Sequence, residues 1–521
     1  MKSPYRVLYS NDTTNIETCV SPYHRRGEPF RENMLDATVD ETAGIGIDVH
    51  MLQPGVGWVP WWNSRVSPFA EQIAFAAQYG ERPEDNGYAQ YLANGGDMVK
   101  AFVARCRKKG LTPFVSLRLN DCHGHEALNL FSREKKKVGA WAWCSLVPIL
   151  ADHPDWRIGG EISDDWNYRA LNWAIPEVRQ YRFALINELA EQYDIDGIEL
   201  DFMRHCSFFD VTKTPPEERV RIMTEFVASV RAVLDRTAKA GRRRWLCVRV
   251  PCFLSEHERL GIDLKEMTAA GVDMVNLSAY YFTEQQTDMA VIRRMIPDSS
   301  VYLEMCHCTQ AGPFGEKGEY DEFLFRPTTP EQYETTAHLA YSRGLDGVSA
   351  FNFVYYREHG LHVEKRGPFR EPPFEVFAHL GDPEWLAQRP QHYLLGHTWN
   401  HVWSFERPMP RDLATGQTTE FILDMAPLAN GWKTGGKLRI QARRELGESR
   451  WTATINGVEL PESENRGEPY DAPYSPIFGT PEQYRAWKVP PEILHDGDNV
   501  VGVTLHRGEP AQIVFLDLAV K

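Results

Sequence analysis

The chain has 521 residues, 42% of them hydrophobic and 25% charged, which is enough for two domains with separate cores. Its 57 basic and 72 acidic side chains give a formal net charge of −15, which argues against nucleic acid or an anionic membrane as a partner. The first residues lack the pattern of a secretion signal, and no apolar run approaches the roughly 18 residues that span a bilayer. We therefore expect a cytoplasmic protein, although a chain from which a signal had been removed would look the same.

The nine cysteines are odd in number and scattered, which indicates reduced structural thiols rather than a disulfide framework. Cys306-His307-Cys308 is the one short segment that suggests metal binding. Structural zinc sites take two such pairs of ligands, and no second pair follows. The sequence therefore predicts no metal and no other cofactor.

Eight short apolar runs alternate with amphipathic helical segments through the first three quarters of the chain. Helices are expected over 176–193 and 216–239, each beginning at a proline suited to a first helical turn. Eight strand-helix units predict the α/β class and a (β/α)₈ TIM barrel over residues 1–389. The expected strands are 6–10, 44–51, 112–120, 197–204, 245–251, 274–281, 300–306 and 347–354.

Long loops follow the second and third of these strands, and both are rich in tryptophan. The first contains "GWVPWWNSR"; the second, residues 121–174, holds Trp141, Trp143, Trp156, Trp166 and Trp173. In a TIM barrel such loops lie on the face that carries the active site. The tryptophan rings could either stack against bound sugars or form the hydrophobic cores of the loops. Their number on this face favours sugar binding.

Residues 390–521 have a different character, with short strands joined by turns and no long helix between them. Asn456-Gly457 predicts a tight hairpin turn. We expect a jelly-roll-like β-sandwich accessory domain. It would brace the barrel, form a dimer contact or bind glycan.

The segment "DIDGIELDFMRH", residues 194–205, places acidic side chains where a buried strand normally has apolar ones. Since alternate residues of a strand share a face, Glu199 and Asp201 would face the barrel axis while Ile198 and Leu200 pack beneath the helices. Asp194 and Asp196 precede the strand, and we interpret both as structural.

By the same alternation, polar side chains are expected at the ends of other strands. A barrel built for stability alone would use branched apolar residues there, because a buried polar group without a partner costs about 1–3 kcal/mol. The ring of polar ends therefore predicts a functional site. Its other members are Asp48 and His50 on the second strand, Arg118 and Asn120 on the third, Arg249 on the fifth, Asn276, Ser278 and Tyr280 on the sixth, Glu304 on the seventh and Asn352 on the eighth.

A pocket with inward carboxylates, an aromatic rim and no phosphate-binding loop suits carbohydrate. Cleavage of a glycosidic bond needs a carboxylic acid and a second carboxylate. We expect Asp201 as general acid/base, Glu304 as the second carboxylate and Glu199 as a neighbour that raises the pKa of Asp201. The predicted substrate-binding residues are Asp48, His50, Arg118, Asn120, Asp121, His123, Arg204, His205, Tyr280 and Asn352.

"YDIDGIELDFMRH" resembles the fourth-strand signature of glycoside-hydrolase-like TIM barrels, namely the bacterial family-10-like glycosylhydrolase proteins and the chitinase-type barrels. In the former, an Arg-Asn-Asp element similar to "SLRLNDCH" here precedes the strand. The resemblance implies a barrel over residues 1 to about 385 and supports Asp201, with Glu199 beside it, as an acid. The chitinase-type motif ends in Glu where this chain has Asp201, and the clan that uses strands four and seven has Asn-Glu where this chain has Leu200-Asp201.

The resulting prediction is a glycoside hydrolase in carbohydrate metabolism that degrades polysaccharides from a chain end, because long loops would wall the pocket. An acidic or sulfated sugar would follow if Arg118, Arg204 and Arg249 converge. Two alternatives stay open: a polysaccharide lyase or sugar isomerase with His205 or Tyr280 as base, and a non-catalytic carbohydrate-binding protein. The sequence leaves the sugar, the linkage and a homo-oligomeric state undecided.

Overall fold

The computed structural model describes residues 2–13, 15–16, 30–140, 142–160, 168–239, 241–311, 325–355, 372–398, 407–470 and 479–521. The chain forms two compact units, the first from Met1–Tyr280 and Val291–Tyr302, the second from Tyr281–Ala290 and Leu303–Lys521. This division differs from the domain boundary expected after residue 389, which stays a prediction. The two units are described separately below.

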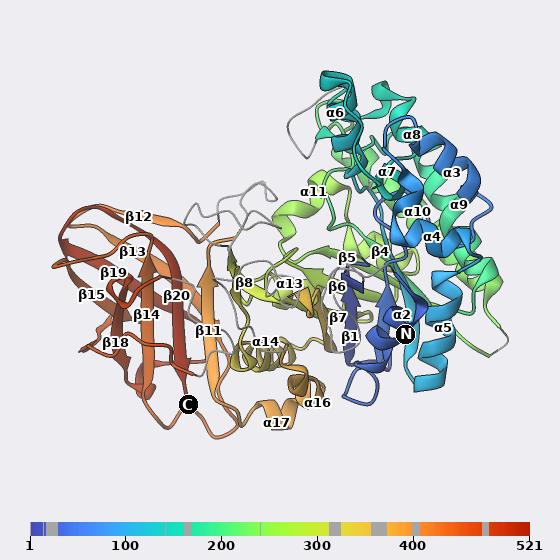
Figure 1. Ribbon diagram of the computed structural model, residues 1–521. Coiled ribbons are helices and arrows are strands. Elements are labelled where there is room, and N and C mark those ends of the chain that lie inside the picture. The colour runs from blue at the N-terminus through green and yellow to red at the C-terminus, as the bar shows by residue number, and fades with distance from the viewer. Residues whose placement is uncertain are drawn as a thin grey trace. The chain divides into compact units, whose positions relative to one another are not determined.

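Eight parallel strands close into a barrel in the order β1-β10-β7-β6-β5-β4-β3-β2, which confirms the predicted α/β barrel (Figure 1). Each of the eight expected runs overlaps one of these strands; β1 and β2 each end one residue later than predicted, and β2 begins five residues later. The strands are β1 (Val7–Asn11), β2 (Val49–Leu52), β3 (Thr112–Arg118), β4 (Gly197–Asp201), β5 (Trp245–Pro251), β6 (Met274–Ser278), β7 (Ser300–Cys306) and β10 (Gly347–Phe351).

Local sequence signals fix the ends of the main helices. The Asp97 side chain caps α5 by accepting from the Lys100 amide, and Gly110 ends that helix at a φ of 77°. Both predicted helices are confirmed as α9 and α10, each with proline at its first turn. The other helices of the first unit are α2 (Glu32–Asp40), α3 (Phe69–Ala76), α4 (Gly87–Ala93), α5 (Met98–Lys109), α6 (Gly124–Glu134), α7 (Ala142–Ser145), α8 (Pro148–Ala151), α11 (His257–Leu260) and α12 (Leu264–Ala269), beside α9 (Pro176–Gln192) and α10 (Pro216–Thr237); α13 (Met289–Met295) crosses the division between the units.

No helix in the described ranges is long and apolar enough to cross a membrane.

The amino-terminal end of the barrel interior is closed by an apolar cluster. Its members come from six strands: Leu8, Val49, Met51, Phe114, Trp245, Cys247, Met274 and Tyr302. Gly197 of β4 is required beside it, because a Cβ atom there would lie 2.5 Å from the Phe114 ring. Since side chains alternate along a strand, this cluster also identifies which residues further along each strand face inward.

In the second unit, two antiparallel sheets share one hydrophobic core, as expected of a β-sandwich (orange to red in Figure 1). One sheet has the order β11-β20-β14-β18-β17, with β12 on β20, and the other β13-β19-β15-β16. Asn456 and Gly457 form the predicted hairpin turn between β15 and β16, both with positive φ. The strands are β11 (Gln391–Gly396), β12 (Arg411–Leu413), β13 (Thr418–Met425), β14 (Gly436–Ala442), β15 (Arg450–Ile455), β16 (Val458–Glu459), β17 (Glu462–Ser463), β18 (Tyr484–Val489), β19 (Gly497–Arg507) and β20 (Ala511–Val520).

This unit also contains a short β-ribbon of β8 (Cys308–Ala311) and β9 (Phe325–Pro327), and the helices α14 (Pro330–Ser342), α16 (Phe377–Leu380) and α17 (Pro383–Leu386).

Candidate active site

Glu199 of β4 lies fully buried inside the barrel, as predicted from the alternation of the strand. Its carboxylate accepts from the Ser116 hydroxyl at 2.7 Å, the Asn276 amide at 3.2 Å and the Cys247 thiol at 3.5 Å. These donors come from β3, β6 and β5, so one carboxylate ties four strands together. With these three donors, Glu199 is the centre of a hydrogen-bonded layer.

Asp201 ends β4 one layer nearer the carboxyl end of the barrel and is also fully buried. The Arg249 Nη1 atom lies 3.1 Å from each Asp201 carboxylate oxygen, and the Met203 amide donates to Oδ1 at 2.8 Å. The parallel register sets Asp201 directly beside Arg249 and also beside Arg118 of β3. Asp201, predicted from the sequence as the general acid/base, therefore forms a buried ion pair with Arg249.

Arg118 joins two further carboxylates at the carboxyl end of β3. Its guanidinium donates to Asp121 Oδ2 at 2.9 Å and to Asp12, which follows β1. All three side chains are buried. Arg118 therefore neutralises a carboxylate on each side, and it is not available as an open cation for an acidic sugar.

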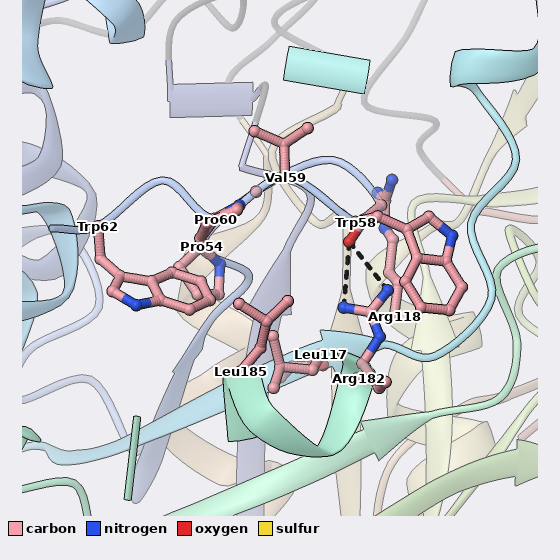
Figure 2. Close-up of a pocket in the computed structure, with 12 residues that line it drawn as sticks. Pro54, Trp58, Val59, Pro60, Trp62, Leu117, Arg118, Arg182 and Leu185 are labelled. Atoms are coloured by element: carbon pink, nitrogen blue, oxygen red, sulfur yellow. Dashed lines mark hydrogen bonds between the residues drawn. The ribbon is translucent and has the colours of Figure 1, made fainter. Parts of the chain in front are cut away.

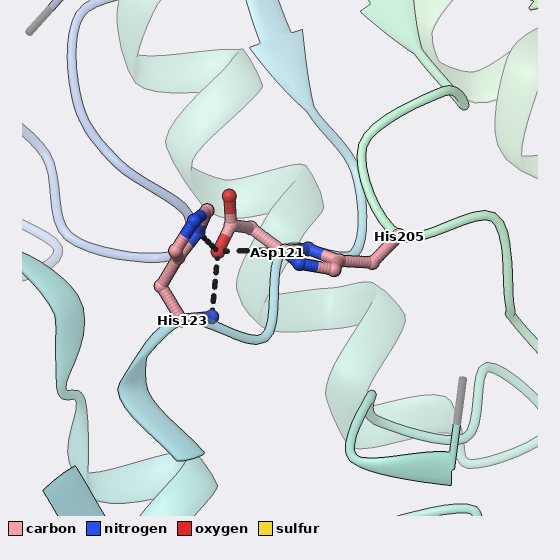
Figure 3. Close-up of side chains that lie close together, drawn as sticks. All are labelled: Asp121, His123 and His205. Atoms are coloured by element: carbon pink, nitrogen blue, oxygen red, sulfur yellow. Dashed lines mark hydrogen bonds and ion pairs between the residues drawn. The ribbon is translucent and has the colours of Figure 1, made fainter. Parts of the chain in front are cut away.

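Asp121 lies between the two imidazole rings of His123 and His205 (Figure 3). Its Oδ1 accepts from His123 Nδ1 at 2.6 Å and from the His123 amide at 2.8 Å, while His205 Nδ1 is 3.9 Å away. Burial raises the pKa of Asp121, but His123, His205 and Arg118 together hold it well below its usual range. Asp121 is thus an ionised group that orients His123 through Nδ1.

His205 lies after β4 with a φ of 56°, a left-handed conformation that a histidine adopts at a cost of about 1–2 kcal/mol. Its Nδ1 accepts from the Cys122 amide at 3.1 Å, which leaves the ring proton on Nε2. Burial lowers the pKa of His205 well below its usual range, against the opposing effect of Asp121. His205 is therefore a neutral imidazole held in one tautomer.

Arg204 connects this histidine pair to the loop after β6. It donates to Tyr280 Oη at 2.9 Å and lies 2.9 Å from His123 Nε2. Tyr280 has a φ of 71°, the second strained residue that follows a barrel strand, and burial raises its pKa to about 12. The chain of contacts brings together Arg204, His123 and Tyr280 as the sequence expected, on loops after three different strands.

Asp121, His123 and His205 have the composition of a metal site, because they offer three ligand atoms within 4.8 Å of one another. Two of these side chains already form hydrogen bonds with guanidinium groups: Asp121 with Arg118, and His123 Nε2 with Arg204. A cation would have to displace both against their charge. The donor set does not fit a metal ion, and we assign none.

Two residues predicted for the mouth of the barrel lie elsewhere, because Val49 and Met51 are the residues of β2 that face the interior. Asp48 precedes the strand at its amino end, where its Oδ2 accepts from the Arg6 and Val7 amides. His50 faces the helices: its Nδ1 contacts the Thr42 hydroxyl, and its ring packs on Phe102 of α5. Burial lowers its pKa to about 3. The predicted substrate contacts of Asp48 and His50 are therefore wrong.

The remaining predicted residues have structural contacts or lie in the second unit. Asn120 is buried, and its amide donates to the Leu171 and Ser207 carbonyls, which pins two loops together. Asn352 follows β10 with a φ of 52°. Glu304 is a buried residue of β7 in the second unit, and its role as the second carboxylate stays a prediction.

Most of the described tryptophans of the two long loops are loop core rather than exposed platforms; Trp156 is partly exposed and stacks on the His153 ring. Trp58, Trp61, Trp143 and Trp173 are buried, and Trp61 stacks on Trp143. Figure 2 shows Trp58 beside Arg182, which donates to the Gly57 carbonyl and lies over the Trp58 ring. The cavity there measures about 10 Å³, room for about one water and not for a sugar. Trp141 and Trp166 lie outside the described residues.

Sequence reasoning missed two residues at the mouth. Asp12 was overlooked although it follows Leu8 and Ser10 at intervals of two, and its contact with Arg118 shows that it faces inward. Gln53 follows Val49 and Met51 in the same way and is 1% exposed. The alternation of side chains along each strand predicts both Asp12 and Gln53 at the mouth, once it is known which residues of β1 and β2 face inward.

No family model matches the chain, and no curated protein does. Solved structures that resemble it include three glycoside hydrolases. Alpha-L-fucosidase isoenzyme 1 from Paenibacillus thiaminolyticus aligns with a TM-score of 0.35 and 12% identity over 96% of this chain and 97% of that one. An Anoxybacillus alpha-amylase aligns with a TM-score of 0.37 and 13% identity over 98% of each chain. The GH20 beta-N-acetylhexosaminidase from Streptomyces coelicolor A3(2) aligns with a TM-score of 0.37 and 10% identity over 74% of this chain and 61% of that one. With TM-scores this low, function has to be inferred from the site.

Proposed function

We propose that the barrel is a glycoside hydrolase in which Asp201 is the ionised carboxylate, acting as nucleophile or as base for water. The observation that supports this most is the Arg249–Asp201 ion pair, buried at the carboxyl end of β4. A carboxylate fixed by an arginine and a backbone amide is preorganised and keeps its charge, as attack at an anomeric carbon requires.

This assignment changes the division of roles expected from the sequence. A hydrolase needs one protonated and one ionised carboxyl group. Since the contacts of Asp201 favour the ionised form, we propose Glu304 as the acid that protonates the leaving oxygen. Glu199 would maintain the barrel layer below Asp201 rather than tune its protonation.

The charge pairing in the first unit favours a neutral sugar over an acidic one. Arg118 contacts Asp12 and Asp121, and Arg249 contacts Asp201, so these guanidinium groups are already balanced by carboxylates. The substrate would be a poly- or oligosaccharide cleaved from a chain end, with His123, His205 and Tyr280 among its hydrogen-bonding partners. A ladder of products from internal cleavage would contradict the chain-end part of this proposal.

Asp201→Asn tests the assignment, with Asp196→Asn as its matched control at the opposite end of the same strand. Asp196 is likewise a buried carboxylate in ion pairs, with Arg107 and Arg242. On a panel of aryl glycosides and oligosaccharides, we expect Asp201→Asn to lower kcat by roughly 10²–10⁴-fold and Asp196→Asn to leave it within a few fold. Equal rates for Asp201→Asn and the parent protein would refute the role of Asp201.

A polysaccharide lyase is the second candidate, favoured by the contacts of Arg204. A β-elimination next to a sugar carboxylate needs a cation on that carboxylate and a base at the adjacent carbon. Arg204 contacts both His123 and Tyr280, which are groups of the right chemistry. With uronic acid polymers, this candidate predicts an unsaturated product that absorbs in the ultraviolet, whereas the hydrolase predicts none.

A further inference from the structure

Gln53 is a buried amide at the mouth of the barrel whose polar atoms are unused. It is 1% exposed, and neither Nε2 nor Oε1 has a hydrogen-bond partner among the residues that the structure describes. The hydroxyl of Ser10 is in the same state at 2% exposure. Buried polar groups in folded proteins nearly always have partners, and exceptions point to a bound molecule or a functional role.

Both side chains face the interior of the barrel. Leu8 of β1 and Met51 of β2 belong to the apolar cluster inside it, and Ser10 and Gln53 each follow one of them by two residues. The parallel register pairs Ser10 with Met51 and Asn11 with Leu52, so the next positions along the two strands are Asp12 and Gln53. Gln53 is therefore adjacent to the Asp12–Arg118 ion pair, on the opposite side of Arg118 from Asp201.

We infer that Gln53 and Ser10 bind neighbouring hydroxyl groups of a neutral sugar beside the Asp12–Arg118 pair. This inference rests on the proposed function, which it deepens by naming the part of the site that selects the ligand. An amide offers donors and an acceptor, and a pair of sugar hydroxyls offers the complementary acceptor and donor. An anionic ligand would leave the Gln53 carbonyl oxygen without a donor, so the chemistry selects a hydroxylated, uncharged group.

The inference predicts an unusual combination of effects on stability and binding. Replacing an unsatisfied buried amide with an apolar side chain of similar shape removes a penalty from the folded protein without ligand. Gln53→Met should therefore raise the midpoint of thermal unfolding. It should also weaken sugar binding by roughly tenfold to a hundredfold, because the hydroxyl partners are lost.

Gln72→Met is the matched control. Gln72 is also a buried amide, 3% exposed, but its Nε2 donates to the Trp143 and Leu146 carbonyls. Its replacement breaks existing hydrogen bonds, so the unfolding midpoint should fall while sugar binding stays unchanged. A higher unfolding midpoint for Gln53→Met and a lower one for Gln72→Met would show that only the Gln72 amide is hydrogen-bonded in the protein without ligand.

The experiment measures thermal unfolding and calorimetric binding of the parent protein and both variants with methyl glycosides of glucose, galactose, mannose and fucose. We expect at least one glycoside to bind the parent and Gln72→Met proteins and to bind Gln53→Met at least tenfold more weakly. A lower midpoint for Gln53→Met, unchanged binding, or no binding of any glycoside to the parent protein would overturn the inference. Binding through Gln53 with no cleavage of any glycoside would retain this subsite and refute the hydrolase instead.

Discussion

Charged side chains of opposite sign alternate across neighbouring strands at the mouth of the barrel. Arg118 pairs in register with Asp201, and Asp201 with Arg249. Such an arrangement costs solvation energy, because each ion leaves water, and it is maintained only while every charge keeps its counterpart. The residues that hold the site together are thus also those whose loss the fold tolerates least.

Arg118→Met tests this at the residue scale. It leaves the buried carboxylates of Asp12 and Asp121 without their cation, so we expect the free energy of unfolding to fall by about 3–5 kcal/mol. Arg221→Met is the control, because Arg221 pairs with Glu218 and Glu225 on the exposed face of α10 and its replacement should change the free energy of unfolding little. Urea denaturation measures both, and equal losses would show that the buried pairs are not coupled to stability.

Individual residues were predictable where the phase of the strand was clear. Glu199 faces inward as expected, because "GIELD" alternates strictly between apolar and acidic residues. Asp48 and His50 were misplaced because the apolar residues of "GIGIDVHM", among them Val49 and Met51, face the barrel interior, the reverse of β4, and only the cluster with Phe114 of β3 shows this. The counterparts of Asp201 and Arg118 could not be predicted, since they depend on the register between strands far apart in the sequence.

At the scale of elements, β4 is fitted to the barrel at both ends. Gly197 leaves room for the Phe114 ring at the amino end, and Asp201 reaches Arg249 at the carboxyl end. Asp194 and Asp196, interpreted as structural from the sequence, form ion pairs with Arg242 just before the strand. The position of the acidic strand thus depends on an apolar contact as much as on charge.

Gly197→Ala probes that fit. A Cβ atom 2.5 Å from the Phe114 ring would force ring or strand to move, and we expect a loss of about 1–3 kcal/mol. Gly139→Ala is the control, since a Cβ there meets nothing within 4 Å. The double variant with Phe114→Leu should recover part of the loss in chemical denaturation; no loss in the single variant would mean that the barrel interior is more open than described.

The eight strands were predictable from apolar runs between helical segments, since each run is short and bounded by turn residues. The burial of the loop tryptophans was not predictable, because composition alone does not distinguish a buried ring from an exposed one. Trp58 is buried where its indole donates to the Asp121 carbonyl of the other loop, and Trp143 where it stacks on Trp61, long-range contacts without a local signal.

At the scale of the whole molecule, buried neutral histidines make stability depend on pH. Burial lowers the pKa of His50 and of His125 to about 3, and that of His205 well below its usual range. Below about pH 6.5 the unfolded chain binds protons at these rings and the folded protein does not, so stability falls as the pH falls. The effect begins near the pKa of the unfolded histidine and continues down to that of the folded one.

His50→Gln should remove one such contribution. Between about pH 7 and about pH 5 each neutral buried ring lowers the free energy of unfolding of the protein by about 2 kcal/mol. The decrease for the variant should therefore be smaller than that for the parent protein by this amount. Thr42→Val removes the hydrogen bond to His50 but no titrating group, and its stability should fall by the same amount at both pH values. Identical pH slopes for His50→Gln and the parent protein would contradict a neutral buried His50.

The central claim is that Asp201 enables water to cleave a glycosidic bond, and analysis of products formed in heavy-oxygen water tests it most directly. With the oligosaccharide that the parent protein cleaves, mass spectrometry should find one heavy oxygen at the new reducing end. Asp201→Asn should give almost no such product, while Asp196→Asn gives it at the parent rate. An unsaturated product without the label, or labelled product from Asp201→Asn at the parent rate, would contradict the claim.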